Sequence, residues 1–154
     1  ESYCGPVKSV KSADLNQFHF ITFVLVSLNA QSHEICFANA GHGPDLYFEA
    51  ATTSFRTLNA SELHEDFRTR QGKKEIRLTL SARDLLVLAT EGRIEVRDSN
   101  GSMFGVDRLQ KLISENQDES AAVTANVLPD ARQGFHRRSH PLDDSTVPII
   151  KRNL

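Results

Sequence analysis

The amino-acid sequence predicts an α+β domain built on mostly antiparallel strands. Strand-like runs of β-branched and aromatic residues fill the first two thirds of the chain, and helical patterns cluster after them. The 154 residues suit one domain, and contents of 39% hydrophobic and 25% charged residues are ordinary for a globular protein. We therefore expect a packed core rather than a disordered or fibrous chain.

The composition excludes several classes of function. The formal net charge of -2 lacks the basic balance of a nucleic-acid-binding protein, so we expect no nucleic-acid partner. The longest apolar run, Ile21 to Leu28, is shorter than the ~20 residues of a membrane-spanning helix. Cys4 and Cys36 lie far apart, which argues against a disulfide scaffold or a thiolate zinc site. We expect a cytoplasmic protein in a reducing setting, without a membrane partner.

The first predicted elements are a loop and a hairpin. Residues 1–17 have no sustained period and are predicted to be a loop, which leaves residues 18–154 for the domain. From Phe18 to Leu28, both the odd-numbered and the even-numbered residues are mostly apolar, which is typical of a central strand covered on both faces. Glu34 to Ala40 is a second strand, and the polar residues between the two predict a hairpin. Gly41 to Pro44 predicts a sharp turn, because glycine admits positive φ and proline fixes φ.

The middle of the chain predicts four more strands. Leu46 to Phe48 and Phe55 to Leu58 flank a small, polar segment, which indicates another hairpin. Asn59 to Gly72 is polar and charged and is predicted to be an exposed excursion. Apolar and polar residues alternate from Ile76 to Leu80, as in a strand with one wet face, whereas Leu85 to Ala89 is apolar throughout. We expect these last two strands to be neighbours.

Two helices and a last strand complete the prediction. Asp107 to Asn116 places its apolar residues on one helical stripe, and Ser120 to Leu128 is a second helix that we expect Pro129 to end. Thr146 to Lys151 is strand-like but contains Pro148. Because proline cannot donate a hydrogen bond to a ladder, this strand should lie at an edge or carry a bulge.

Three segments, in this order, resemble the SpoIIE/RsbU branch of the PPM-type (type 2C) protein serine/threonine phosphatases. The first combines a strand similar to the FVT strand of that family with its NAGHxP turn, the second resembles LxPGDxLLLYTDG followed by GxxFGxxRL, and the third resembles the closing DDxT strand. In this chain they are Phe20 to Val26 with Ala38 to Pro44, Leu80 to Gly92 with Gly101 to Leu109, and Asp143 to Val147.

The resemblance implies an αββα sandwich that holds two divalent cations, Mn²⁺ or Mg²⁺, on carboxylates, backbone carbonyls and waters. A metal-bound water would attack the phosphorus of a phosphoserine or phosphothreonine. By position, the metal-site residues are Glu91, Gly92, Asp143 and Asp144. The resemblance also implies a phosphorylated bacterial regulatory protein, such as an anti-sigma-factor antagonist, as the substrate.

The sequence departs from the family pattern in two ways that bear on activity. The front motifs of the family, G-D-x-x-D and D-x-x-G-H-G, have no match before Phe18, so the N-terminal part of the domain is missing from these residues. Glu91 stands where the family has aspartate, which moves the carboxylate by ~1.5 Å. Metal distances are held to about ±0.2 Å, so we expect weaker metal binding. The alternative function is therefore a catalytically inactive, phosphatase-like binding module, and a purely structural domain is a third hypothesis.

Simpler interpretations of these residues stay open. Glu91 can be a solvated carboxylate at a strand end, and Asp143 with Asp144 can be a charged turn, although two adjacent carboxylates gain from a cation. His42 fits a turn residue that hydrogen-bonds locally better than it fits a general acid. Thr90 lies outside any G-x-S-x-G elbow, so it has no support as a nucleophile.

One further segment carries alternatives of its own. His136, His140 and Asp143 have a spacing that zinc could use, but it is loose, and chance explains it better. Arg137 with Arg138 forms a basic pair that is either solvated surface or a contact for a phosphorylated partner. A homodimer and a longer parent chain are both compatible with the sequence, which begins at Glu1 rather than at a methionine.

Overall fold

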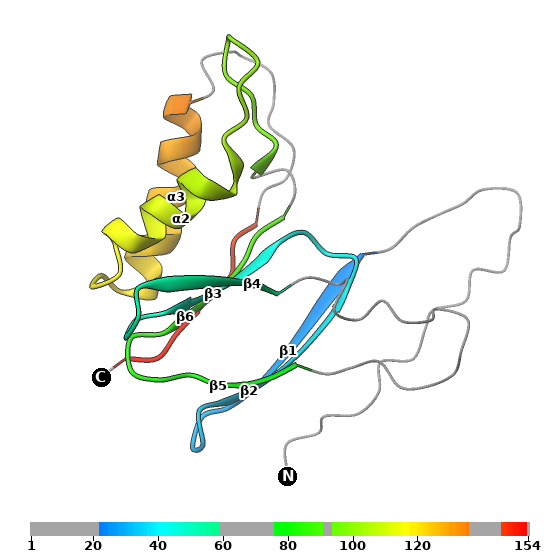
Figure 1. Cartoon of the computed structure of the whole chain (residues 1–154), viewed down its shortest axis with the longest axis vertical. Coiled ribbons are helices and arrows are strands. Elements are labelled where there is room, and N and C mark those ends of the chain that lie inside the picture. The colour runs from blue at the N-terminus through cyan, green and yellow to red at the C-terminus, as the bar shows by residue number, and fades with distance from the viewer. Residues whose placement is uncertain (1–21, 59–75, 91–93, 136–145, 154) are drawn as a thin grey trace, which may run out of the picture. The chain divides into compact units, whose positions relative to one another are not determined.

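The computed structural model describes residues 22–58, 76–90, 94–135 and 146–153 (Figure 1). These residues form two compact units, each with its own antiparallel sheet. The first unit contains residues 22–42 and 76–79, and the second contains residues 43–58, 80–90, 94–135 and 146–153. The predicted α+β class with mostly antiparallel strands is confirmed. No helix in the described ranges is long and apolar enough to span a membrane.

The first unit is a three-stranded sheet with the order β1-β2-β5, formed by Phe23–Asn29, Glu34–Ala40 and Ile76–Thr79. The predicted hairpin between β1 and β2 is present. Its turn is closed by Asn29, whose Oδ1 accepts hydrogen bonds from the backbone N–H groups of Gln31 (2.9 Å) and Ser32 (3.1 Å). His33 completes the turn with a φ of 58°.

Two features of the first unit differ from the expectations within the described residues. Within the described sheet β1 is an edge strand rather than a central one, and Leu25 and Leu28 on it are 52% and 46% exposed. Strand propensity and apolar character are local properties, and they do not determine which neighbours a strand has. Cys36 on β2 is disulfide-bonded, contrary to the expectation that the cysteines form no disulfide.

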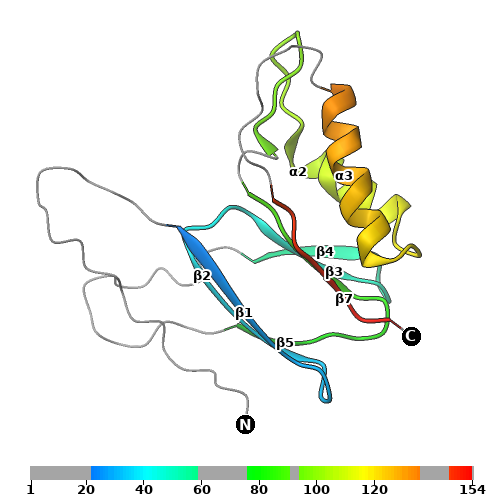
Figure 2. The ribbon, with the colours of Figure 1, turned by 180° about the vertical axis from the view of Figure 1, so that it is seen from behind.

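The second unit is a four-stranded sheet with the order β4-β3-β6-β7, covered by two helices. The expectation that Ile76 to Leu80 and Leu85 to Ala89 are neighbouring strands is wrong, because β5 pairs with β2 in the first sheet and β6 pairs with β3 in the second. Figure 2 shows β7, in red, at one edge of this sheet and beside α3. Pro148 precedes β7, and β7 pairs only with β6 among the described strands, so the predicted edge position is confirmed. The strands are β3 (Asp45–Glu49), β4 (Ser54–Leu58), β6 (Leu85–Leu88) and β7 (Ile149–Lys151), and the helices are α2 (Gly105–Glu115) and α3 (Ala121–Phe135).

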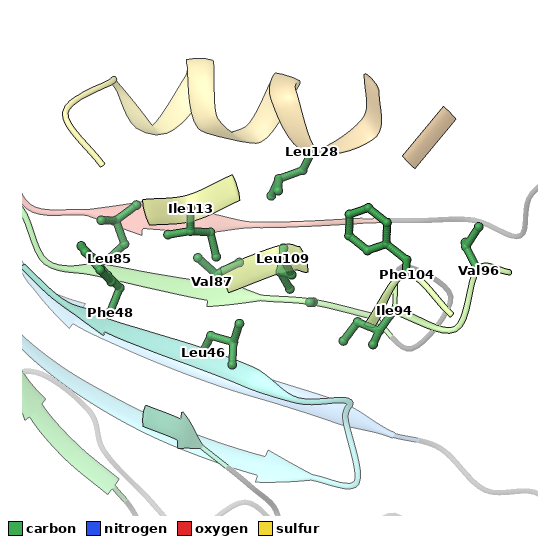
Figure 3. Close-up of a cluster of buried hydrophobic side chains, with 11 residues drawn as sticks. Leu46, Phe48, Leu85, Val87, Ile94, Val96, Phe104, Leu109, Ile113 and Leu128 are labelled. Carbon is green, nitrogen blue, oxygen red and sulfur yellow. The ribbon is translucent and has the colours of Figure 1, made fainter. Parts of the chain in front are cut away.

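The core of the second unit lies between the sheet and the helices (Figure 3). Alternate side chains of β3 and β6 point toward α2 and α3, where Leu109, Ile113 and Leu128 meet them. The sheet residues of this core are Leu46, Phe48, Leu85 and Val87, and Ala89 follows directly after β6. Because side chains alternate along a strand, Asp45, Tyr47, Leu86 and Leu88 lie on the opposite face of the sheet, and all four are buried.

Helix α3 continues past Pro129, so the prediction that this proline ends the helix is wrong. A proline inside a helix removes one backbone hydrogen bond and crowds the preceding turn. Here the later turn is held by tertiary packing, since the ring of Phe135 meets the ring of Phe104 edge to face with centroids 5.6 Å apart. Leu128, next to the proline, is 3% exposed in the core.

Candidate functional site

The ends of β6 and β7 meet at one edge of the second sheet. The register pairs Leu85 with Lys151 and Val87 with Ile149, and the N–H of Leu88 donates a 3.0 Å hydrogen bond to the carbonyl of Pro148. The chain therefore leaves β6 and enters β7 at the same end of the sheet, which we call the metal edge because the predicted metal ligands adjoin it in the sequence. It follows that the two stretches of sequence with predicted metal ligands are anchored side by side.

The lengths of chain beyond these anchors limit how far the predicted ligands can lie from them. Glu91 follows Leu88 by three residues, so their Cα atoms are at most about 11 Å apart. Asp144 precedes Pro148 by four residues, for a limit of about 14 Å. A carboxylate from each stretch can thus reach a common ion near the metal edge.

The predicted metal-site residues Glu91, Gly92, Asp143 and Asp144 lie outside the described residues, as do the alternative ligands His136 and His140. Their roles remain predictions. Within the described ranges, no group of three or more histidine, cysteine, aspartate or glutamate side chains could hold a metal ion.

The side chain of Asn39 closes the turn that contains His42. The side chain of Asn39, which is 5% exposed, accepts a 2.8 Å hydrogen bond from the N–H of His42 through Oδ1. Its Nδ2 donates to the carbonyl of His42 at 3.2 Å. The local hydrogen bonding predicted at His42 is present and runs through its backbone. Gly41 within this turn has a φ of +77°, which suits glycine.

Thr90 is the last described residue before Glu91, and its hydroxyl is buried without a hydrogen-bond partner. Thr90 Oγ1 is buried and has no hydrogen-bond partner in the described structure. Leaving a buried hydroxyl unpaired costs about 1–3 kcal/mol, so such a group usually has a ligand or water to satisfy it. An oxygen that can both donate and accept suits a site of hard cations and their waters.

Asp45 is a second polar group at this end of the sheet, and its burial was not predicted from the sequence. It begins β3, is fully buried, and is the cross-strand partner of Leu88. The residue follows the predicted Gly41 to Pro44 turn, where a carboxylate is ordinarily solvated. The available signal was its position directly before a fully apolar strand segment.

Asp84 marks the opposite end of β6 and has a structural role. Its carboxylate accepts three hydrogen bonds: Tyr47 Oη at 2.6 Å, the N–H of Ala50 at 2.9 Å and the N–H of Ser81 at 2.7 Å. These donors compensate the complete burial of Asp84. Burial raises the pKa of Tyr47, and so do the hydrogen bond and the negative charge of Asp84. Tyr47 therefore stays protonated and donates to Asp84.

A second set of bonds holds β7 at this opposite end. Lys151 Nζ donates to the backbone carbonyls of Gln117 (2.6 Å) and Glu119 in the connection between α2 and α3. Burial lowers the pKa of Lys151, and the charge of Arg83 lowers it further. Arg152 donates from its guanidinium to the carbonyl of Leu80 at 2.7 Å. These bonds fix the register of β7 against β6, and with it the geometry of the metal edge.

Comparison with known proteins then decides the family. Residues 7–153 match the family described as Stage II sporulation protein E (SpoIIE). The chain belongs to the SpoIIE family. Its members are PP2C-type serine/threonine phosphatases, and the resemblance to the SpoIIE/RsbU branch predicted from the sequence is confirmed.

The chain is also similar to individual members of this group. It is 30% identical over 138 residues to "Phosphoserine phosphatase RsbU" of Bacillus subtilis strain 168, covering 88% of the chain and 40% of RsbU. The solved SpoIIE phosphatase domain of Bacillus subtilis superposes with a TM-score of 0.63 at 15% identity, over 86% of the chain and 56% of that domain. The SiaA-PP2C domain of Pseudomonas aeruginosa gives 0.60 at 16% identity, over 85% and 50%. The chain thus has the PP2C-type phosphatase fold and spans 40% to 56% of these relatives.

Proposed function

We propose that this chain forms part of a metal-dependent protein serine/threonine phosphatase. The proposed substrate is a phosphoserine or phosphothreonine on a bacterial regulatory protein of the anti-sigma-factor-antagonist type. The observation that carries the proposal is the shared edge of β6 and β7, where the N–H of Leu88 meets the carbonyl of Pro148. Membership of the SpoIIE family and the similarity to the phosphoserine phosphatase RsbU support it.

The residues around the metal edge fit divalent cations in their chemistry. Glu91, Asp143 and Asp144 would offer carboxylate oxygens, and Gly92 a backbone carbonyl, which are the donors that Mn²⁺ and Mg²⁺ prefer. The buried hydroxyl of Thr90, which has no hydrogen-bond partner in the described structure, could bind a water of such a site. Support also comes from the SpoIIE phosphatase domain of Bacillus subtilis, one solved structure of which is described as Mn presoaked.

In this mechanism the ions, when bound, supply an acidified water as the nucleophile at neutral pH. Glu91 and Asp143 would hold the ions by their carboxylates, and hydrolysis would form a bond from a water oxygen to the phosphorus while the bond from the phosphorus to the seryl oxygen breaks. The proton of the water leaves to solvent, and the seryl oxygen takes up a proton from solvent. Thr90 directly precedes Glu91, and its Oγ1 could hold a water and limit the orientation of that water.

A second candidate function is a phosphatase-like binding module without turnover. The specific observation in its favour is Glu91, which replaces the aspartate of the family pattern with a longer side chain. In such a module the metal edge would still recognise a phosphorylated partner, but no water would be held at the distance that hydrolysis needs.

The test is phosphate release from a phosphoserine peptide by the full-length gene product. We expect release that requires Mn²⁺ and that falls by at least about 100-fold in an Asp143→Asn variant with an unchanged circular dichroism spectrum. Binding of the phosphopeptide without release would favour the binding module. Release that persists in excess chelator would refute a metal-dependent phosphatase.

A further inference from the structure

We propose that Asn100 is a site of spontaneous deamidation, at which the backbone nitrogen of Gly101 attacks the side-chain amide of Asn100. This modification is independent of the proposed phosphatase function. It lies in the hairpin of residues 96–104, in light green before α2 in Figure 1, which we call the Asn100 hairpin. Of all the asparagines in the sequence, only Asn100 is followed by glycine.

The reacting residues lie in the tight turn of the Asn100 hairpin. The N–H of Asp98 donates a 2.9 Å hydrogen bond to the carbonyl of Ser102, which closes the hairpin. Within it, the N–H of Gly101 donates to the carbonyl of Asp98 at 3.1 Å. Asn100 and Gly101 are both exposed. Solvent water and base therefore have access to the atoms that react.

Gly101 is suited to be the attacking residue. It has a φ of +82°, a conformation that glycine adopts without strain. A Cβ added there would meet nothing within 4 Å, so the space around the residue is open. Because glycine itself has no Cβ, no side chain hinders the approach of its backbone nitrogen to Asn100.

The reaction needs only base and water. A base removes the N–H proton of Gly101, and a bond forms between this nitrogen and Cγ of Asn100. The bond from Cγ to the side-chain nitrogen breaks, and that nitrogen takes a proton from solvent and leaves as ammonia. The product is a cyclic succinimide. Solvent water then opens the ring at either carbonyl, which leaves aspartate or isoaspartate at position 100.

Asp98 restrains this reaction in the folded protein. Its Oδ1 accepts hydrogen bonds from the N–H groups of Asn100 (2.8 Å) and Ser102 (2.9 Å). Its carbonyl also accepts a bond from the N–H of Gly101, whose proton must be lost before attack. Ring closure requires the nitrogen of Gly101 to contact Cγ of Asn100, and bonds that hold the turn in one conformation oppose this approach. Opening of the turn should therefore limit the rate.

Deamidation would change both the charge and the shape of the Asn100 hairpin. Either product places a second carboxylate close to Asp98 in the chain. Isoaspartate also adds one carbon to the main chain of the turn. Because the turn determines the register of a hairpin, we expect this product to loosen the bridge between Arg97 and Met103 and the 2.7 Å bond from Arg97 to the carbonyl of Gly101.

The experiment follows each asparagine of the full-length gene product during incubation in mildly alkaline buffer. Peptide mass spectrometry measures the conversion of amide to acid, and chromatography separates aspartate from isoaspartate. Asn29 is the matched control within the same molecule. It also lies in a hairpin turn, where its Oδ1 accepts hydrogen bonds from two backbone N–H groups, but alanine follows it. The variants Gly101→Ala and Asp98→Ala are measured beside the wild type.

We expect Asn100 to deamidate at least about tenfold faster than Asn29, which corresponds to an activation barrier lower by about 1.4 kcal/mol. Both aspartate and isoaspartate should form. Gly101→Ala should slow the reaction, because its Cβ crowds the attacking nitrogen. Asp98→Ala should accelerate it, because the two bonds to Oδ1 are lost.

Equal rates at Asn100 and Asn29 in the wild type would overturn the proposal. This comparison needs no variant, so it holds even if a substitution disturbs the fold. Aspartate without isoaspartate would exclude the succinimide, since ring opening at either carbonyl gives both. An unchanged rate in Gly101→Ala would refute the role of the glycine, and an unchanged rate in Asp98→Ala would refute the restraint by Asp98.

Discussion

Replacing Tyr47 with phenylalanine removes the 2.6 Å hydrogen bond to Asp84 and nothing else of the side chain. A buried hydrogen bond to a charged group contributes about 1.5–3 kcal/mol, so we expect the free energy of unfolding at pH 7 to fall by about that amount. Asp84 keeps its bonds from the N–H groups of Ala50 and Ser81, which prevents a larger loss. Urea unfolding followed by circular dichroism measures the difference.

The same variant has a predicted pH dependence. The pKa of Tyr47 is raised in the folded protein, first by burial and then by Asp84. Its contribution is therefore fully present below the unfolded pKa of about 10 and is lost as the pH rises above that value toward the folded pKa. The advantage of the wild type over Tyr47→Phe should shrink by up to about 1.4 kcal/mol between pH 9 and pH 11.

The matched control is Arg56→Gln, which removes the cation that lies 6.0 Å from the centre of the same ring. We expect it to cost less than about 1 kcal/mol at pH 7, because the contact is exposed. A Tyr47→Phe variant as stable as the wild type at pH 7 would contradict the structural role of Asp84. A difference that stays constant up to pH 11 would contradict the raised pKa of Tyr47.

Three further predictions concern the metal, the backbone and the core. The 154-residue chain alone should bind Mn²⁺ weakly and release phosphate slowly or not at all, and chelator should leave its melting temperature unchanged. Glu91→Asp should raise the Mn²⁺ affinity in a calorimetric titration. Robust turnover by the unmodified chain would refute this prediction. Arg83 has a φ of 73°, so Arg83→Gly should stabilise the fold by up to about 1 kcal/mol despite the loss of an exposed ion pair with Asp118, and a lower melting temperature would count against backbone strain there. Ile113 is fully buried in the helix-side core, so Ile113→Ala should cost about 2–5 kcal/mol in urea unfolding, whereas a cost below about 1 kcal/mol would mean that the core is packed differently.

The strands and hairpins could be predicted because their signals are local. The alternation from Ile76 to Leu80 and the turn residues around Asn29 report the environment of each residue directly in the sequence. The length of α3 could not be predicted in this way. The rule that proline ends a helix is also local, and it was overridden at Pro129 by the packing of Phe135 on Phe104, which are distant in sequence.

In the candidate site, too, only what depends on local sequence could be predicted. Glu91 and Asp143 were placed by resemblance to a family, and the structure adds only that the strands leading to them share an edge. Asp45 was missed because a carboxylate after a turn is ordinarily solvated, and only the pairing of β3 between β4 and β6 reveals that it is buried. The hydroxyl of Thr90 was considered only as a nucleophile, since an unpaired hydrogen-bonding group is a property of the folded protein alone.

The most direct test of the central claim is paramagnetic broadening of backbone amide signals by Mn²⁺ in the full-length gene product. Broadening decreases steeply with distance from the ion, and Asp84 and Leu88, at the two ends of β6, lie about 13 Å apart in an extended strand. If the metal edge is the metal site, the amides of Leu88, Thr90 and Thr146 lose their signals at low Mn²⁺, while those of Asp84 and Lys151 at the opposite end remain. Loss at Asp84 and Lys151 first, or no site-selective loss at all, would contradict the assignment of the metal site to this edge.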